Sequence, residues 1–349
     1  MRYRINALVA VVLLFLVSII QGCTGSAKTE PVTKNGFMLD TNIEITAYGD
    51  KAIADKAVND AFTRIRDIDN KMSPELPSSY VVKINEAAGK NYVKVDEDTF
   101  YVIKEGIKYG DMTNGMFDIS IGPLVKLWGI GTEHARVPSK EEIENALKLI
   151  DYKKIEVNDT KKEVKLSSEG MMMDLGGIAK GYAADAVKDV LKSDGISSAI
   201  INLGGNVYAM GSKPDGSEWR IGIQDPFSSR GNYVAIVKVK DKSVVTSGNY
   251  ERYFEVNGKR YHHIFDLTTG YPSDNGIVSA TIVSDRSIDG DALSTSVFVL
   301  GIDKGLKLVE SLDGIEAIII TSDKKIYSTA GAKDILEITD KEYTYEDRR

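Results

Sequence analysis

The sequence predicts an α+β fold in which antiparallel β-sheets carry packed helices. Helical patterns are commonest before Lys154, whereas short strand-like segments dominate after it. Asn257-Gly258 joins two of these segments, and this dipeptide between strands is a strong hairpin signal. No proline- or glycine-rich linker interrupts residues 37–340, so we expect one compact domain there, with room for two lobes, and a polar tail at 341–349.

The first part of this domain predicts one strand followed by helices. The strand shows alternating, β-branched residues, and the helices show apolar residues at helical spacing. The last of these helices also opens with the capping-box pair Ser139 and Glu142. The strand is expected at 37–48, and the helices at 50–72, 97–111 and 139–150.

The second part predicts many short strands interrupted by two helices. The strand-like segments before the hairpin are KIEV, KEVKL, MMMDL, SAIINL, NVYAM, WRIGIQ, YVAIVKVK and SVVTS. Strands return near the C-terminus at 317–321 and 325–328, and the helices are expected at 177–193 and 289–300. Strands this short and closely spaced pair mainly through hairpins, which favours antiparallel sheets.

The N-terminal residues predict a lipoprotein signal peptide. Two arginines precede an apolar run at 7–20, which is too short to span a bilayer comfortably, and the run leads to Cys23 in a pattern that resembles a bacterial lipobox. Removal of residues 1–22 would leave Cys23 to carry acyl chains such as palmitate, with 23–36 as a tether. We therefore expect an extracytoplasmic protein that is lipid-anchored to the cell membrane. An ordinary secretory signal with a chance cysteine is the alternative.

Composition excludes several kinds of site. Cys23 is the only cysteine in 349 residues, so the domain has no disulfide, thiolate metal site or cysteine nucleophile. The net charge of −7 argues against a nucleic-acid partner. The three histidines, His134, His262 and His263, are too few to favour a multi-histidine zinc site.

The segment MMMDLGGIAKGYAAD, at 171–185, holds the first group of candidate site residues. Asp174 would end a strand, Gly176 and Gly177 permit a sharp turn, and Lys180 falls in the first turn of the next helix. Such a helix start suits an anion, because its N–H groups are unpaired and its dipole end is positive. The structural alternative is that Asp174 caps the helix and Lys180 faces solvent.

Two further groups follow. Asp291 and Thr295 are four residues apart on one face of a predicted helix, and their oxygen atoms suit Mg²⁺. The alternative for this group is a cluster of aspartates that caps the helix. His262 and His263 face opposite sides of a strand, so at most one points into a site, where it can act as a general base.

Together these motifs resemble the ApbE family of bacterial FAD:protein FMN transferases. The resemblance runs from about Phe37 to Ser328 and rests on GMFDISIGPLVKLWG, DLGGIAKGYAAD, INLGGN, TSGNYER, HIFDLTTGYP and DALST. It implies a T-fold-like α+β architecture. It also implies an enzyme that uses Mg²⁺ to move the FMN half of FAD onto a serine or threonine hydroxyl of a partner electron-transfer protein, releasing AMP.

The resemblance implies a role for each motif residue. The metal would take the backbone oxygen of Gly177 and the side chains of Asp291 and Thr295. His263 is expected to be the catalytic base, while Asp291 acts mainly as a metal ligand. The residues expected to bind the flavin cofactor are Leu39, Met116, Phe117, Asp118, Asp174, Lys180 and Ile264.

Two other functions use the same residues. In an FAD pyrophosphatase, water would replace the acceptor hydroxyl, giving free FMN and AMP. A flavin-binding lipoprotein without catalysis is the second alternative, although a binder needs no Mg²⁺ site. If Gly177 acts through its backbone, Gly177→Ala should be mild, whereas Asp174→Ala and Asp291→Ala should be severe.

Overall fold

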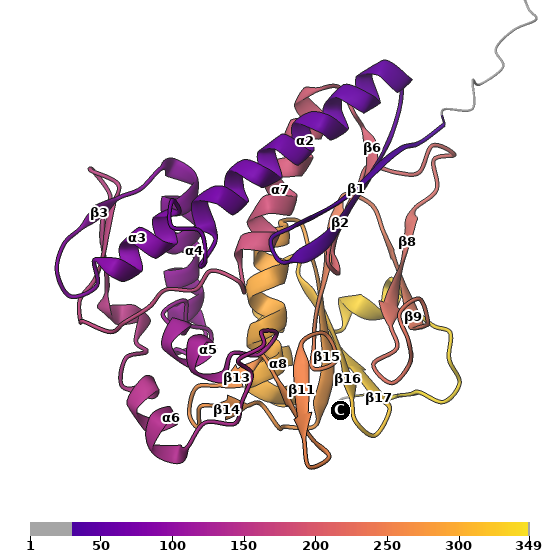
Figure 1. The fold of residues 1–349 in the computed structure, drawn as a ribbon. Coiled ribbons are helices and arrows are strands. Elements are labelled where there is room, and N and C mark those ends of the chain that lie inside the picture. Colours follow the sequence, from indigo (N-terminus) through magenta and orange to yellow (C-terminus); the bar gives the residue numbers. More distant parts are fainter. Residues whose placement is uncertain (1–29, 348–349) are drawn as a thin grey trace, which may run out of the picture. The chain divides into compact units, whose positions relative to one another are not determined.

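The computed structural model describes residues 30–347 of the chain (Figure 1). The predicted signal peptide, Cys23 and the first residues of the tether lie outside this range. From Pro31 onward the chain forms one compact unit. Within the described range, no helix combines the length and apolar character needed to cross a membrane.

A nine-stranded sheet forms the centre of this unit. Its neighbouring strands are antiparallel, except that the last two are parallel. In sheet order the strands are β1 (Val32–Met38), β2 (Thr41–Tyr48), β6 (Ser198–Leu203), β7 (Asn206–Met210), β10 (Lys242–Gly248), β15 (Ile277–Ser284), β16 (Glu316–Thr321), β17 (Lys325–Ser328) and β19 (Thr344–Tyr345).

Three helices cover one face of this sheet: α2 (Lys51–Met72), α7 (Ala179–Ser193) and α8 (Ser287–Glu310) (Figure 1). Their apolar stripes meet the sheet in the largest hydrophobic core, which includes Ile45, Ile65 and Phe298. Burying a side chain of this size stabilises the fold by roughly 1.5–3 kcal/mol. Helix α8 is interrupted at Gly301, whose φ of 82° is not helical.

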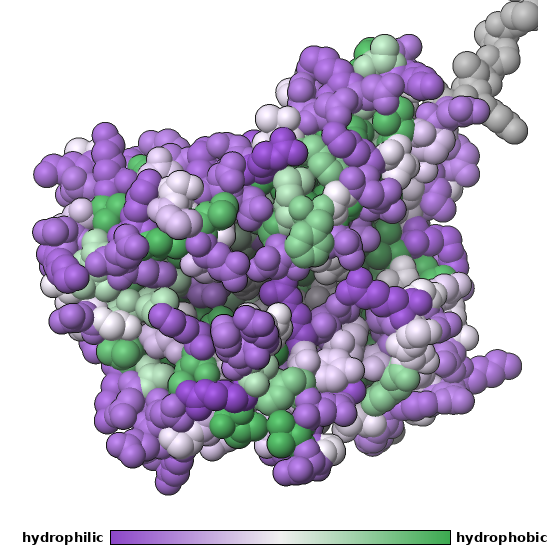
Figure 2. Space-filling view, viewed as in Figure 1, coloured by the Kyte–Doolittle hydropathy of each residue, from purple (hydrophilic) through white to green (hydrophobic). Residues whose placement is uncertain are grey.

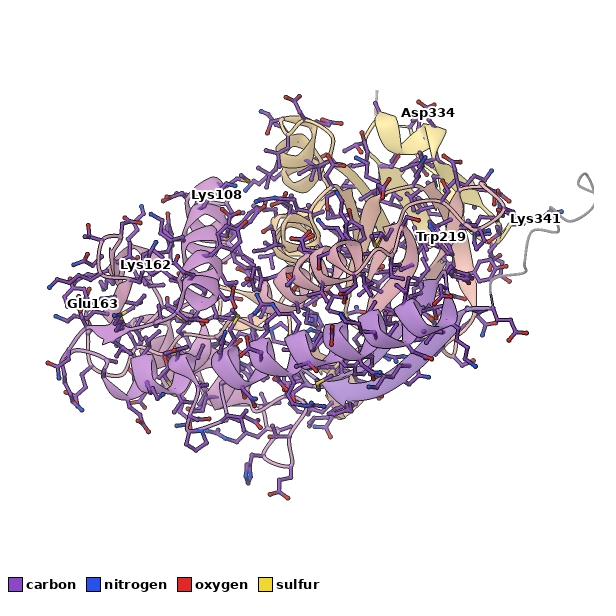
Figure 3. All side chains as sticks on the ribbon, turned by 90° about the horizontal axis from the view of Figure 1, so that it is seen from above. Lys108, Lys162, Glu163, Trp219, Asp334 and Lys341 are labelled. Carbon is purple, nitrogen blue, oxygen red and sulfur yellow. The ribbon has the colours of Figure 1, made fainter. Side chains whose placement is uncertain are left out.

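A smaller sheet covers the opposite face. It contains β18 (Leu336–Ile338), β9 (Tyr233–Val239) and β8 (Trp219–Gln224), in that order. The 3₁₀ helix η2 (Gly331–Asp334) precedes β18. Val237 of the smaller sheet and Ile318 of the central sheet belong to the same buried cluster, so the two sheets share a core. Figure 3 shows Trp219, Asp334 and Lys341 together on this side of the unit.

The remaining helices lie at the end of this unit where Figure 3 shows Lys108, Lys162 and Glu163. The elements at this end are α3 (Tyr80–Glu86), α4 (Glu97–Met112), α5 (Gly122–Trp128), α6 (Lys140–Leu147), η1 (Tyr152–Lys154) and a three-stranded sheet of β3 (Val93–Lys94), β5 (Glu163–Leu166) and β4 (Ile155–Asn158). Trp128 of α5 is fully buried, and its indole N–H donates to Gly270 O at 3.0 Å. Hydrophilic residues cover most of the face in Figure 2, and hydrophobic ones occur in scattered groups.

Two small hairpins lie beside Trp128: β11 (Tyr253–Val256) with β12 (Lys259–His262), and β13 (Phe265–Asp266) with β14 (Tyr271–Pro272). The rings of Phe254, Tyr261, Phe265 and Tyr271 all contact the Trp128 ring. The hairpin predicted at Asn257-Gly258 is confirmed, and both residues have the positive φ of a tight two-residue turn (53° and 76°).

The predicted fold class, α+β with antiparallel sheets and packed helices, is confirmed. Each predicted helix is present, and Ser139 and Glu142 make both bonds of the capping box. The predicted end of the last helix at Leu300 coincides with the interruption at Gly301. The helix α5 and the strand β15 were not predicted.

The predicted boundaries at the two ends of the domain are wrong. Residues 32–36, expected in the tether, belong to β1, because they pair with β2. The single strand expected at 37–48 is two strands joined by Leu39 and Asp40, each with φ of 53°. The predicted polar tail contributes β19, and Tyr343 before it is only 5% exposed.

The predicted MMMDL strand is also absent. This segment makes only one isolated bridge, from Met172 to Ile121, and is otherwise extended chain between loops. Met171 and Met173 are nonetheless buried, which accounts for their apolar character. A buried extended segment and a strand have the same composition, because both shield apolar side chains from water.

Candidate active site

The starts of α7 and α8 meet around Asp291, which is 4% exposed. Its Oδ2 accepts a hydrogen bond from Gly181 N at 2.8 Å. Its Oδ1 lies 3.3 Å from Lys180 Nζ, and this ammonium also donates to Gly176 O at 2.9 Å. A positive charge therefore sits between a carbonyl of the glycine turn and a buried carboxylate.

Close approach of the two helices depends on Gly181. A Cβ atom at this position would lie 2.4 Å from Ser287 O and 2.7 Å from Asp291 Cβ. Only glycine leaves the space that brings the Asp291 carboxylate to the backbone of α7.

Asp174 reaches the site through the extended segment before it. The Asn85 side chain accepts from Met173 N at 2.7 Å and donates to Met173 O at 3.0 Å. Asp174 N donates to Ile119 O at 2.9 Å. These bonds take the place of a β-ladder, which explains how the segment stays ordered without being a strand.

The Asp174 side chain caps the glycine turn. Its Oδ1 accepts from Gly176 N at 2.7 Å. Burial raises the pKa of Asp174, and the nearby charges of Lys180 and Arg252 oppose this increase. The structural alternative, in which Asp174 caps the helix, is wrong, because the N-cap residue of α7 is Ile178 and the Asp174 side chain bonds to the turn before the helix. Nor does Lys180 face solvent, because it is bound within the site and only 25% exposed.

The two histidines have different environments. His262 is 5% exposed, and both ring nitrogens are engaged, because Nε2 lies 3.0 Å from Ser273 O and Nδ1 accepts from Ile264 N at 3.3 Å. His263 Nδ1 lies 3.2 Å from Arg252 O. A carbonyl can only accept, so Nδ1 carries the proton and Nε2 is the basic nitrogen.

The neighbourhood of His263 keeps its ring neutral. Burial is the largest cause that lowers its pKa, to about 3, and the positive charges of Arg252 and Lys180 act in the same direction. At neutral pH the ring is therefore unprotonated, and Nε2 carries a lone pair.

Sequence reasoning did not select Arg252 as a site residue. Its Nη2 donates to Asp40 O at 2.8 Å, and its carbonyl accepts from both N and Nδ1 of His263. Arg252 thus links the β1–β2 turn, which includes Leu39, to the histidine segment. The only sequence signal for it was its place in the segment TSGNYER.

The donor atoms near Asp291 are hard oxygens. Thr295, one turn further along α8, has its Oγ1 3.3 Å from Ser247 Oγ. Residues 30–347 contain no cluster of three or more His, Cys, Asp or Glu side chains that could hold a metal. One carboxylate, one hydroxyl and backbone carbonyls fit Mg²⁺, which keeps several waters and needs few protein ligands. The Lys180 ammonium beside Asp291 Oδ1 marks a position that favours a cation.

Of the other predicted flavin contacts, Phe117 lies next to the glycine turn. Phe117 is 5% exposed and packs under the glycine turn, where a Cβ on Gly177 would lie 3.2 Å from its Cε2. Ile264 is buried, Met116 is half-buried, and Leu39 lies in the β1–β2 turn.

Asp118 has structural bonds to both of its oxygens. Oδ1 accepts from Ser120 N and Oγ, each at 2.7 Å, and Oδ2 accepts from Tyr152 N at 2.9 Å. Burial raises the pKa of Asp118, and these bonds oppose the increase. The carboxylate fastens η1 to the loop that carries Phe117, so its predicted contact with flavin stays a prediction.

Comparisons with known proteins identify the family to which this chain is similar. Residues 39–319 match the sequence model of the ApbE family. The chain is 32% identical to the FAD:protein FMN transferase of Treponema pallidum, covering 93% of this chain and 94% of that protein. It is 39% identical to that of Klebsiella pneumoniae, covering 79% and 84%.

Solved structures show the same architecture. The crystal structure of the ApbE protein from Thermotoga maritima has a TM-score of 0.82 and 35% identity, covering 88% of this chain and 99% of that chain. The flavin transferase ApbE from Vibrio cholerae has a TM-score of 0.79 and 28% identity over the same shares.

Proposed function

The chain belongs to the ApbE family, and we propose that it transfers the FMN half of FAD to a serine or threonine hydroxyl of a partner protein. One observation carries the proposal. The Lys180 ammonium lies between Gly176 O and Asp291 Oδ1, and its charge helps to keep the His263 ring neutral, with the proton on Nδ1. Phosphoryl transfer needs this combination of charge stabilisation and a base.

Asp291 Oδ1, the Thr295 hydroxyl and the backbone oxygen of Gly177 would hold Mg²⁺. The ion would act as a Lewis acid that neutralises charge on the FAD pyrophosphate. The Lys180 ammonium, which pairs with Asp291 Oδ1 in the structure, would add a second positive charge to the site. Asp291 Oδ2 stays bonded to Gly181 N, so the carboxylate is oriented before any ion binds.

In the transfer step, the acceptor hydroxyl oxygen forms a bond to the phosphorus of the FMN half. The bond between that phosphorus and the bridging oxygen breaks, and AMP leaves with the electron pair. His263 Nε2 takes the hydroxyl proton, while Arg252 O holds the proton on Nδ1. The products are a phosphodiester-linked FMN, AMP and one proton.

Intact-protein mass spectrometry tests this function. The purified protein, FAD, Mg²⁺ and an acceptor protein with a candidate threonine should give an acceptor mass increase equal to FMN, with one AMP per adduct. EDTA or Asp291→Ala should abolish the adduct. Asp189→Ala, on an exposed part of α7, is the matched control and should not. FMN and AMP formed at the same rate without acceptor would instead establish a pyrophosphatase.

We also propose that Cys23 carries the lipid that anchors the protein outside the cytoplasm, where an electron-transfer protein would be the acceptor. The lipobox-like sequence supports this proposal. Cys23→Ala should move the protein from the membrane to the soluble fraction of cells and remove acyl chains from its N-terminal peptide. An unchanged distribution would exclude lipidation as the anchor.

A further inference from the structure

Neither of the two helices that meet at the site caps its own N-terminus. The N-cap residues are Ile178 for α7 and Arg286 for α8, and neither makes a side-chain capping bond. Uncapped starts leave backbone N–H groups without partners, which is costly when they are buried.

Each helix is instead capped by an aspartate of the other. Asp185 of α7 accepts from Ser287 N (Oδ1, 2.9 Å) and Ile288 N (Oδ2, 3.0 Å), the first two residues of α8. Asp291 of α8 accepts from Gly181 N of α7 at 2.8 Å. We call Asp185 and Asp291 the reciprocal caps.

We infer that Asp185 is a positioning residue that holds the metal-binding oxygen of Asp291 in place, an inference that rests on the function proposed above. Asp291 follows Ser287 by one helical turn, so the anchored start of α8 fixes where its carboxylate lies. Oδ2 of Asp291 accepts a hydrogen bond from the backbone of α7. This leaves Oδ1 as the oxygen that faces the cation position.

The surroundings of Asp185 favour this role over a surface ion pair. Its side chain is 15% exposed, and among residues 30–347 it forms an ion pair only with Lys188, at 3.8 Å. Two backbone N–H groups and the positive end of α8 compensate the buried charge. The α7–α8 crossing at Gly181 leaves no space in which α8 could shift toward α7.

Asp185→Asn tests the inference, because the amide nitrogen cannot accept from the second N–H group. Asp189→Asn is the matched control: it removes the same charge one turn along α7 from a side chain that is 74% exposed. Calorimetric titration with MgCl₂ alone should give a dissociation constant about 10- to 100-fold higher for Asp185→Asn, the usual range for groups that orient metal ligands. The control should match the wild type, and excess Mg²⁺ should restore the transfer rate of Asp185→Asn.

Hydrogen exchange of the wild-type protein provides a second measurement that does not depend on a variant folding. Peptides covering 178–185 and 284–291 should both exchange more slowly when MgCl₂ is added, because the ion fixes a carboxylate that links them. Equal Mg²⁺ affinity in Asp185→Asn and the control, or protection confined to 284–291, would overturn the inference. Failure of the wild type to form the FMN adduct would instead count against the proposed function, since neither measurement here requires an acceptor.

Discussion

In acid, His263 should lower the free energy of unfolding of the wild-type protein. The variant His263→Gln should not show this part of the decrease. The pKa of His263 falls from 6.5 to about 3 on folding, mainly through burial. Between these values the unfolded chain binds a proton that the folded protein does not. The free energy of unfolding therefore decreases as the pH falls below 6.5. The decrease caused by His263 reaches its full size only near pH 3.

The size of this effect follows from linkage. From about pH 7.5 to about pH 4.5, the two pKa values predict a loss of about 2.7 kcal/mol. This loss hardly depends on the pKa of His263 in the folded protein, because the ring in the folded protein is still mostly neutral at the lower pH. His263 is partly exposed, so solvent screening reduces the amount, and we expect about 2 kcal/mol.

Urea unfolding at the two pH values measures the difference directly. The free energy of unfolding of His263→Gln should fall by about 2 kcal/mol less than that of the wild type. His134→Gln, at a side chain that is 83% exposed, controls for the loss of a histidine. Contributions from other groups, including the buried His262, cancel in the comparison. Parallel losses in wild type and His263→Gln would refute the view that folding keeps this ring neutral.

Three further predictions concern the backbone around the site. Gly177→Ala should slow FMN-adduct formation only a few-fold, because its Cβ would meet the edge of the Phe117 ring at 3.2 Å and the ring can shift; a complete loss would contradict a purely backbone role. Gly181→Ala should lower the melting temperature strongly or prevent folding, because its Cβ would lie 2.4 Å from the carbonyl oxygen of Ser287; a wild-type thermal transition would show that the helices can separate. Asn85→Ala should lower the free energy of unfolding by about 2 kcal/mol in urea, because two bonds to the segment before Asp174 are lost; an unchanged midpoint would show that this segment does not need the asparagine.

Local signals in the sequence predicted the elements whose structure depends on neighbouring residues. The capping box at Ser139 and the Asn257-Gly258 turn are set by bonds within a few residues, and both are present. The amphipathic helix at 51–72 follows from a stripe that packs on one face of the sheet. Such features can be predicted because the interactions that determine them lie within a short stretch of the sequence.

Elements decided by distant contacts could not be predicted in this way. β15 has the sequence IVSATIVS and is buried on both faces, so it shows no alternation of polar and apolar residues. The MMMDL segment has strand-like composition, but its partners are the Asn85 side chain and the loop at Ile119. Arg252 was missed because its role depends on Asp40, which is 212 residues away in the sequence.

Asp291 shows that two roles predicted as alternatives from the sequence can be combined in one side chain. For Asp291, capping a helix and binding a metal were treated as alternatives, because a cap was assumed to serve its own helix. In the structure Asp291 caps the other helix with Oδ2, which directs Oδ1 toward the cation position. Capping and metal binding are therefore compatible, since they use different oxygens of one carboxylate. The capping residue and the capped helix are 110 residues apart in the sequence, so no local sequence pattern indicates the interaction. It can be recognised only from the structure, where α7 and α8 cross.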